Sequence, residues 1–333
     1  MRIRRRLPIW LGVLLVVAAV ALAVVLRKHA PPEPARLLPS ADGFVYVNLK
    51  WFRRANLTGQ LPAVSPAPSY EQFIQATGFQ FERDLDQAAI AIHYPERRAK
   101  TASDSPCFSE VLVGRIDGER VQAYFQSLAK SVETYRSRDI YSIPIEGRTF
   151  RAVILGPDTV AASNEPNQQV IEGIVDRSRK LASPFGGPPL LRQYYKQIPL
   201  ASLAWAVFRV DPEGKSVAGA PDISFLFAQP AVVVVSARYL RALHLRAEAF
   251  AGNQEQAQRV TQQVGTFLTL FHAAETAAPA HGADPDVKQF LDSLEVTQQN
   301  DRAVLTASVP PGFIRKAIAS PDEFEAPGKV SPK

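Results

Sequence analysis

The feature that most constrains this chain is an unbroken run of apolar residues near its N-terminus, from position 9 to position 26. As a helix rising about 1.5 Å per residue, the run would be roughly 27 Å long, close to the hydrocarbon thickness of a bilayer. It therefore predicts a transmembrane anchor, with a short cytoplasmic tip, over residues 1–28. The anchor residues include Ile9, Trp10, Leu14, Val17, Leu22 and Leu26.

Basic residues around this run favour one orientation. Four arginines precede it and only two basic residues follow it closely, which places the N-terminus in the cytoplasm and the bulk of the chain in the periplasm or outside the cell. The alternative is a cleaved signal peptide, for which Ala21-Leu22-Ala23 offers a cleavage site. The apolar run continues beyond that site to Leu26, which favours an uncleaved anchor.

The net charge of +6 comes entirely from this N-terminal segment. Residues 1–30 hold six basic and no acidic side chains, and the rest of the chain has 32 of each sign. A nucleic-acid-binding domain carries an excess of clustered Lys and Arg. The charge balance therefore predicts no nucleic-acid partner.

Cys107 is the only cysteine, so the chain can form no intramolecular disulfide. No histidine or basic residue adjoins it in the sequence, and nothing there would lower the pKa of its thiol. We interpret Cys107 as a small buried apolar residue.

Proline-rich segments flank the predicted globular part. Residues 29–40 contain four prolines and predict an extended spacer. Residues 320–333 are polar, lack periodicity and predict a disordered tail.

Between these segments, the pattern predicts an α+β fold with two tandem lobes, each an antiparallel sheet covered by helices on one face. The lobes are residues 41–182 and 190–319, and a Gly- and Pro-rich seam at 183–189 separates them. Both run strands, helix, hairpin, helix, an order typical of a duplication. A single interlocked domain is the alternative.

Local signals place several elements. Strands are expected at 43–49, 88–94 and 110–116, and short helices at 70–76 and 82–86. Asp117 is a suitable N-cap for a helix whose apolar positions extend to Val132. Asn253 caps a long helix, and Asn300-Asp301 joins a hairpin spanning 295–309.

Searches for a catalytic, cofactor-binding or metal-binding signature identify none. Gly214-Lys215-Ser216 ends like a phosphate loop but lacks the first glycine of that motif. No two histidines lie three or four residues apart, as a local zinc site would need. Glu82, Asp84 and Asp86 are best explained by favourable contact with a helix dipole. The chain therefore favours a non-enzyme.

Two surface features are candidates for binding. The long helix has a polar face that is rich in glutamine and nearly uncharged, including Gln254, Gln258 and Gln262, which is compatible with a protein interface. Trp51 lies among basic residues after the first strand and could contact lipid headgroups. Because buried aromatic side chains dominate core energetics, we expect Trp51 to pack inward.

The opening at 37–48, from Leu37-Leu38-Pro39 to Val47-Asn48, and the hairpin ending at Val309-Pro310 resemble bacterial membrane-anchored proteins of the DUF3352-like kind. The resemblance implies an envelope protein and supplies no catalytic residues. Our first hypothesis is a non-catalytic envelope protein that binds proteins or envelope components. The second is a carrier of lipids or other apolar ligands in a groove between the lobes, and an enzyme is the third.

Overall fold

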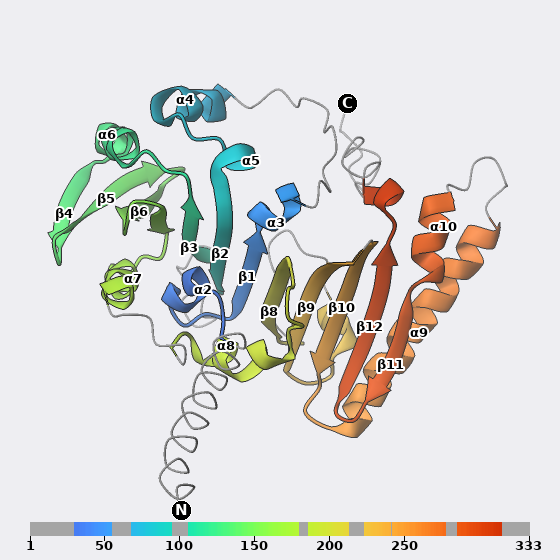
Figure 1. Cartoon of the computed structure of the whole chain (residues 1–333). Helices are drawn as coiled ribbons and strands as arrows, with labels where there is room; N and C mark the ends of the chain where they lie inside the picture. The colour runs from blue at the N-terminus through green and yellow to red at the C-terminus, as the bar shows by residue number, and fades with distance from the viewer. Residues whose placement is uncertain are drawn as a thin grey trace, which may run out of the picture.

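One large antiparallel sheet organises the molecule. The computed structural model describes residues 30–54, 68–94, 106–179, 186–212, 223–240, 242–277 and 285–314. Within them, twelve strands form a single sheet in the order β11-β12-β10-β9-β8-β1-β2-β3-β7-β6-β5-β4. Figure 1 shows this sheet from β4 at the left edge to β11 at the right, with α9 along the right-hand end.

Helices of varied length lie between groups of strands along the chain. The strands are β1 (Gly43–Asn48), β2 (Leu85–His93), β3 (Cys107–Gly114), β4 (Ser131–Tyr135), β5 (Arg138–Ile145), β6 (Arg148–Ile154), β7 (Thr159–Ser163), β8 (Ala204–Val210), β9 (Ala231–Leu240), β10 (Ala242–Phe250), β11 (Glu295–Gln299) and β12 (Arg302–Val309). The helices are α2 (Glu33–Leu37), α3 (Leu49–Arg54), α4 (Pro68–Thr77), α5 (Phe81–Asp84), α6 (Gly118–Leu128), α7 (Gln169–Arg179), α8 (Pro189–Tyr194), α9 (Gln254–Ala277) and α10 (Pro285–Asp292), with 3-10 turns η1 (Tyr195–Gln197) and η2 (Ser224–Leu226).

The prediction of two separate sheets is wrong, because the two halves share one sheet. β1 pairs with β2 on one side and with β8 on the other. Phe44 lies opposite Val207 in this second pairing, and Tyr46 lies opposite Trp205. The seam at residues 183–189 therefore connects two parts of one interlocked sheet.

The predicted fold class also included a spanning helix, and here too the structure departs from it. Among the helices in the described part of the chain, none is both long enough and apolar enough to cross a bilayer. The segment 9–26, with the six predicted anchor residues, lies outside the described residues.

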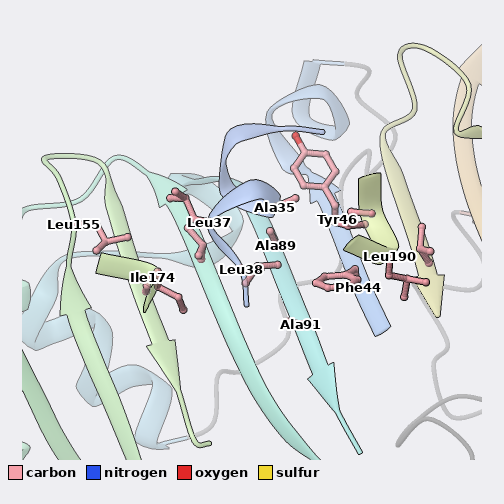
Figure 2. Packing of buried hydrophobic residues seen from close by; sticks show 14 of the residues in the cluster. Ala35, Leu37, Leu38, Phe44, Tyr46, Ala89, Ala91, Leu155, Ile174 and Leu190 are labelled. Carbon is pink, nitrogen blue, oxygen red and sulfur yellow. The ribbon is translucent and has the colours of Figure 1, made fainter. Parts of the chain in front are cut away.

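Helix α2 overturns the prediction of an extended spacer at 29–40. Pro34 near its start and an acidic residue in its first turn both favour helix initiation there. Leu37 and Leu38 are 5% and 1% exposed, so this segment belongs to the core. Figure 2 shows Ala35, Leu37 and Leu38 lying over strand β2, which carries both Ala89 and Ala91.

Both predicted helix caps are confirmed. The Asp117 carboxylate accepts a hydrogen bond from the Arg120 backbone N–H at 3.2 Å, and Asn253 accepts one from Gln256 at 2.9 Å. Helix α6 nevertheless ends at Leu128, because the backbone of the next residue is extended. Val132 is therefore in strand β4, where a helix was expected.

One face of the sheet is covered by α2, α7 and α8. Its principal cluster joins these helices to the central strands and includes Phe44, Val111, Ile174, Leu191 and Val207. Arg177 of α7 donates to the Leu37 carbonyl at 2.7 Å, which ties the end of α2 to this layer.

The opposite face is covered only towards its two ends by the described helices that form core clusters. Beneath α9, Val260 packs with Val233 and Ala303. At the other end, Phe125 of α6 packs against Tyr141 and neighbouring residues of β5 and β6. Strands β8, β1, β2 and β3 lie between these two clusters.

Candidate functional site

The strongest candidate site is the part of the sheet between α6 and α9. Strand register places eight side chains there in two rows of four, one from each of β8, β1, β2 and β3. We call this surface the open face: Ala206, Val45, Ile90 and Glu110 in one row, and Ala204, Val47, Ala88 and Leu112 in the other. All eight are half-buried, and none belongs to a core cluster.

The same strands bury their other side completely. We call this second surface the sealed face: Val207, Phe44, Ala91 and Ser109 in one row, and Trp205, Tyr46, Ala89 and Val111 in the other. Each of these is at most 4% exposed. An antiparallel sheet with one solvated face normally carries polar residues on it. The open face is apolar at seven of its eight positions, so it has the character of a surface that binds something.

Small side chains give the open face its shape. Ala88, Ala204 and Ala206 form much of the floor, which spans roughly 14 Å across four strands at normal strand spacing. At one end, a Cβ on Gly43 would lie 3.3 Å from the Cβ of Phe208 and close to Ile92. These two larger residues therefore close that end over the glycine.

Helix α9 borders the open face on the β8 side. Phe208 and Val235 pack against the cluster beneath it, together with Val264. Along the helix, the apolar stripe becomes more exposed, from 4% at Val260 to 46% at Phe267 and 63% at Phe271. The C-terminal part of α9 thus presents apolar side chains that the described sheet does not cover.

Glu110 is the only ionisable residue of the open face. Its cross-strand neighbours are Ile90 and Ala162, both apolar. Among the described residues, none forms a hydrogen bond or ion pair with its carboxyl, and burial raises its pKa. Its oxygens are absent from the fully buried unpaired polar atoms, so the carboxyl keeps some contact with the surface.

Glu248 on the other face of β10 provides a contrast. Its carboxylate is buried but accepts from Arg246 Nε at 2.7 Å and from Arg302 Nη1 at 2.7 Å. Arg302 also contacts Gln197 and lies over the Phe250 ring. Glu248 is thus a satisfied structural acid, whereas Glu110 has no such partner.

The glutamines predicted as an interface are on the surface. Gln254, Gln258 and Gln262 are all exposed on α9. They are spaced four residues apart, so they share one side of the helix. Trp51 is 50% exposed, so the expectation that it packs inward is wrong.

Cys107 has a neighbour that the sequence did not indicate. It lies directly opposite His93 in the β2–β3 pairing. Burial and the nearby Glu165 raise the pKa of the Cys107 thiol, and burial lowers the pKa of His93. Both shifts favour the neutral forms, the opposite of the shifts that activate a nucleophilic cysteine.

A chain of buried hydroxyls continues from this histidine. His93 Nε2 lies 3.3 Å from Ser109 Oγ, which lies 2.9 Å from Ser163 Oγ. Both serines are at most 3% exposed. A substrate could not reach them, and their hydrogen bonds satisfy polar groups inside the sheet.

The three acidic residues at 82–86 make separate structural contacts. Asp84 is buried, and the hydrogen bond from Arg83 lowers the pKa of its carboxyl. Asp86 pairs with Arg53, and Glu82 accepts from the Tyr70 hydroxyl at 2.7 Å. β2 begins at Leu85, so the expected helix at 82–86 is replaced by a short turn of helix and a strand.

A cavity of about 700 Å3 lies away from the open face, at the start of α6. Its lining combines the N-terminus of α6 with the β4–β5 and β6–β7 turns, and includes Asp117, Arg138, Asp139 and Tyr141. Its lining is polar and apolar in nearly equal parts, and none of the eight residues of the open face belongs to it.

Metal and nucleotide sites find no support in the described residues. No group of three or more His, Cys, Asp or Glu side chains there could hold a metal ion. The phosphate-loop-like segment at 214–216 lies outside the described residues.

Comparisons with known proteins identify only distant structural similarity. No protein-family model matches the chain, and no curated protein matches it. Crystal form III of TP0453 is similar over 87% of this chain and 99% of its own, with a TM-score of 0.47 and 11% identity. Crystal form IV of TP0453 is similar with a TM-score of 0.45 and 9% identity. At these values the similarity supports no inference about function, and the DUF3352-like resemblance stays a prediction.

The sequence contains a signal for the open face. Within β2, Ala88, Ile90 and Ile92 alternate with Ala89 and Ala91, so both sides of the strand are apolar. In β3, Glu110 shares its side of the strand with Leu112 and interrupts an otherwise apolar row. That interruption marks the residue that now stands out in the site.

Proposed function

We propose that this chain is a non-catalytic binding protein for small apolar molecules, which it holds on the open face. The observation that carries the proposal is the contrast between the two sides of β8, β1, β2 and β3. Both sides are apolar, yet the described helices seal only one of them. Apolar surface of this kind gains free energy when a ligand removes it from water, at about 25 cal/mol per Å2.

The position of this surface supports the carrier hypothesis in a modified form. The groove was expected between two lobes, and the open face lies where the two halves of the sheet meet, at the β1–β8 pairing. Three of its eight side chains are alanines, which rise least above the backbone of the sheet.

Binding of the neutral fluorescent probe N-phenyl-1-naphthylamine to the full chain tests this proposal. We expect wild-type protein to bind the probe and Ala206→Phe to weaken binding, because the added ring occupies the floor. Ala123→Phe, at an exposed position of α6, is the matched control and should bind as wild type does. Absence of probe binding by the wild type, or equal binding by both variants, would overturn the proposal.

A second candidate is protein binding at the C-terminal part of α9. The exposed apolar residues Phe267, Leu270 and Phe271 favour it, because contiguous exposed apolar surface often marks an interaction site. Cross-linking in cells would compare Phe271→Ser with a Gln254→Ala, Gln258→Ala, Gln262→Ala variant. Loss of one defined cross-link in the first variant alone would assign the interface to the apolar stripe, and loss in the second alone to the glutamine face. A pattern unchanged in both would remove this candidate.

A further inference from the structure

We propose that the open face selects apolar molecules that carry a protonated amine, and that Glu110 is the residue that selects them. This inference rests on the proposed function, because it names the chemical class of ligand for the same surface. It concerns one carboxyl group in an otherwise apolar site.

The position of Glu110 in an apolar row is the first piece of evidence for this selection. It lies on β3, at the end of a row that continues through Ile90 on β2, Val45 on β1 and Ala206 on β8. A ligand with its polar end at Glu110 would extend its tail across three strands, all apolar in this row. This arrangement fits an amphiphile with a single head group.

The lack of a described partner for the Glu110 carboxyl is the second piece of evidence. No described residue pairs with the Glu110 carboxyl, and its cross-strand neighbours Ile90 and Ala162 cannot donate through their side chains. A carboxylate surrounded by apolar groups is unfavourable unless a donor or a cation pairs with it. A ligand ammonium would supply both a positive charge and hydrogen-bond donors.

The charges around the open face are the third piece of evidence. Where α3 meets the start of β2, Asp86 is already paired with Arg53 and lies near Lys50. The opposite end, around Gly43, is closed by Phe208 and Ile92. Glu110 is thus the one described group of the open face that can attract a cationic head group, and none of the eight residues of that face attracts an anionic one.

Three ligands with the same tail test the selection: decylamine, 1-decanol and decanoate, each displacing N-phenyl-1-naphthylamine from the full-length protein at neutral pH. We expect decylamine to bind roughly tenfold more tightly than 1-decanol, because its ammonium brings a positive charge to the Glu110 carboxylate and the neutral hydroxyl does not. Decanoate should bind most weakly, because its carboxylate meets Glu110.

Glu110→Gln should remove the preference for decylamine and leave 1-decanol binding unchanged. Glu71→Gln, an exposed substitution on α4, makes the same change in net charge and should keep the preference. Failure of the wild type to bind the probe would overturn the proposed function. Probe binding with no preference for the amine, or a preference that survives Glu110→Gln, would overturn this inference alone.

Discussion

The two sides of the four central strands are both largely apolar, but helices cover only one of them among the described residues. On the sealed face, α2, α7 and α8 bury Phe44, Val207 and their neighbours completely. On the open face, Val45 and Ala206 come from the same strands, one residue along, and remain half-buried. The apolar pattern of a strand therefore shows which residues avoid water, but it does not show what covers them.

The largest expected effect is a difference in stability between two matched substitutions, one on each face. Phe44→Ala should destabilise the protein by about 3–5 kcal/mol, because it leaves a cavity in a closed core. Val45→Ala should cost only about 1 kcal/mol, because its side chain is already partly in water. Urea unfolding of both variants measures the difference. Similar losses would show that the open face is packed as tightly as the sealed one.

Glu248 and Glu110, the acidic residues of the two faces, should respond differently to substitution, and Glu248 should show the larger effect. Glu248→Ala should cost about 3 kcal/mol, because it leaves Arg246 and Arg302 without their shared partner. Chemical denaturation measures this loss, and Glu295→Ala at an exposed edge position is the control. A loss no greater than that of the control would mean that the ion pairs are not formed in solution.

Glu110→Leu should change the stability of the protein in the opposite direction. Replacing an unpaired carboxyl by an apolar group of similar size orphans no donor, so stability at neutral pH should rise by about 1 kcal/mol. The midpoint of urea unfolding, compared with wild type, measures the gain. A clear loss of stability would indicate that Glu110 has a partner in solution.

The smallest expected effect is a pH dependence of stability. Burial raises the pKa of Glu110 in the folded chain, so the unfolded chain releases this proton at a lower pH. Relative to Glu110→Gln, wild type should be equally stable below about pH 4, lose stability as pH rises towards the folded pKa, and stay lower by a constant amount above it. Thermal unfolding of both proteins between pH 4 and 8 measures this. Parallel curves would contradict it.

Two helix caps and one hairpin turn were predicted correctly from local sequence signals. The caps at Asp117 and Asn253 and the hairpin at Asn300 depend on neighbouring residues only, and the structure confirms them. Asn300 has a positive φ of 55°, as a tight hairpin turn requires. Such features need no knowledge of distant parts of the chain.

Long-range pairing could not be derived in the same way. The pairing of β1 with β8 joins Phe44 to Val207, and no turn between them fixes their register. Val132 matched helical spacing, but pairing with Tyr141 of β5 places it in β4. The Cys107–His93 contact likewise depends on strand register. In each case, tertiary pairing determined the outcome.

The central position of β1 has a consequence for how the protein is made. During synthesis, β1 can pair with β2 early, but β8 emerges only after residue 204. Until then, the other edge of β1 has unpaired backbone groups, which can pair with another chain. A fragment ending before β8 would keep that edge, and we expect it to aggregate or exchange strands. The first half of this chain therefore depends on the second to complete its fold.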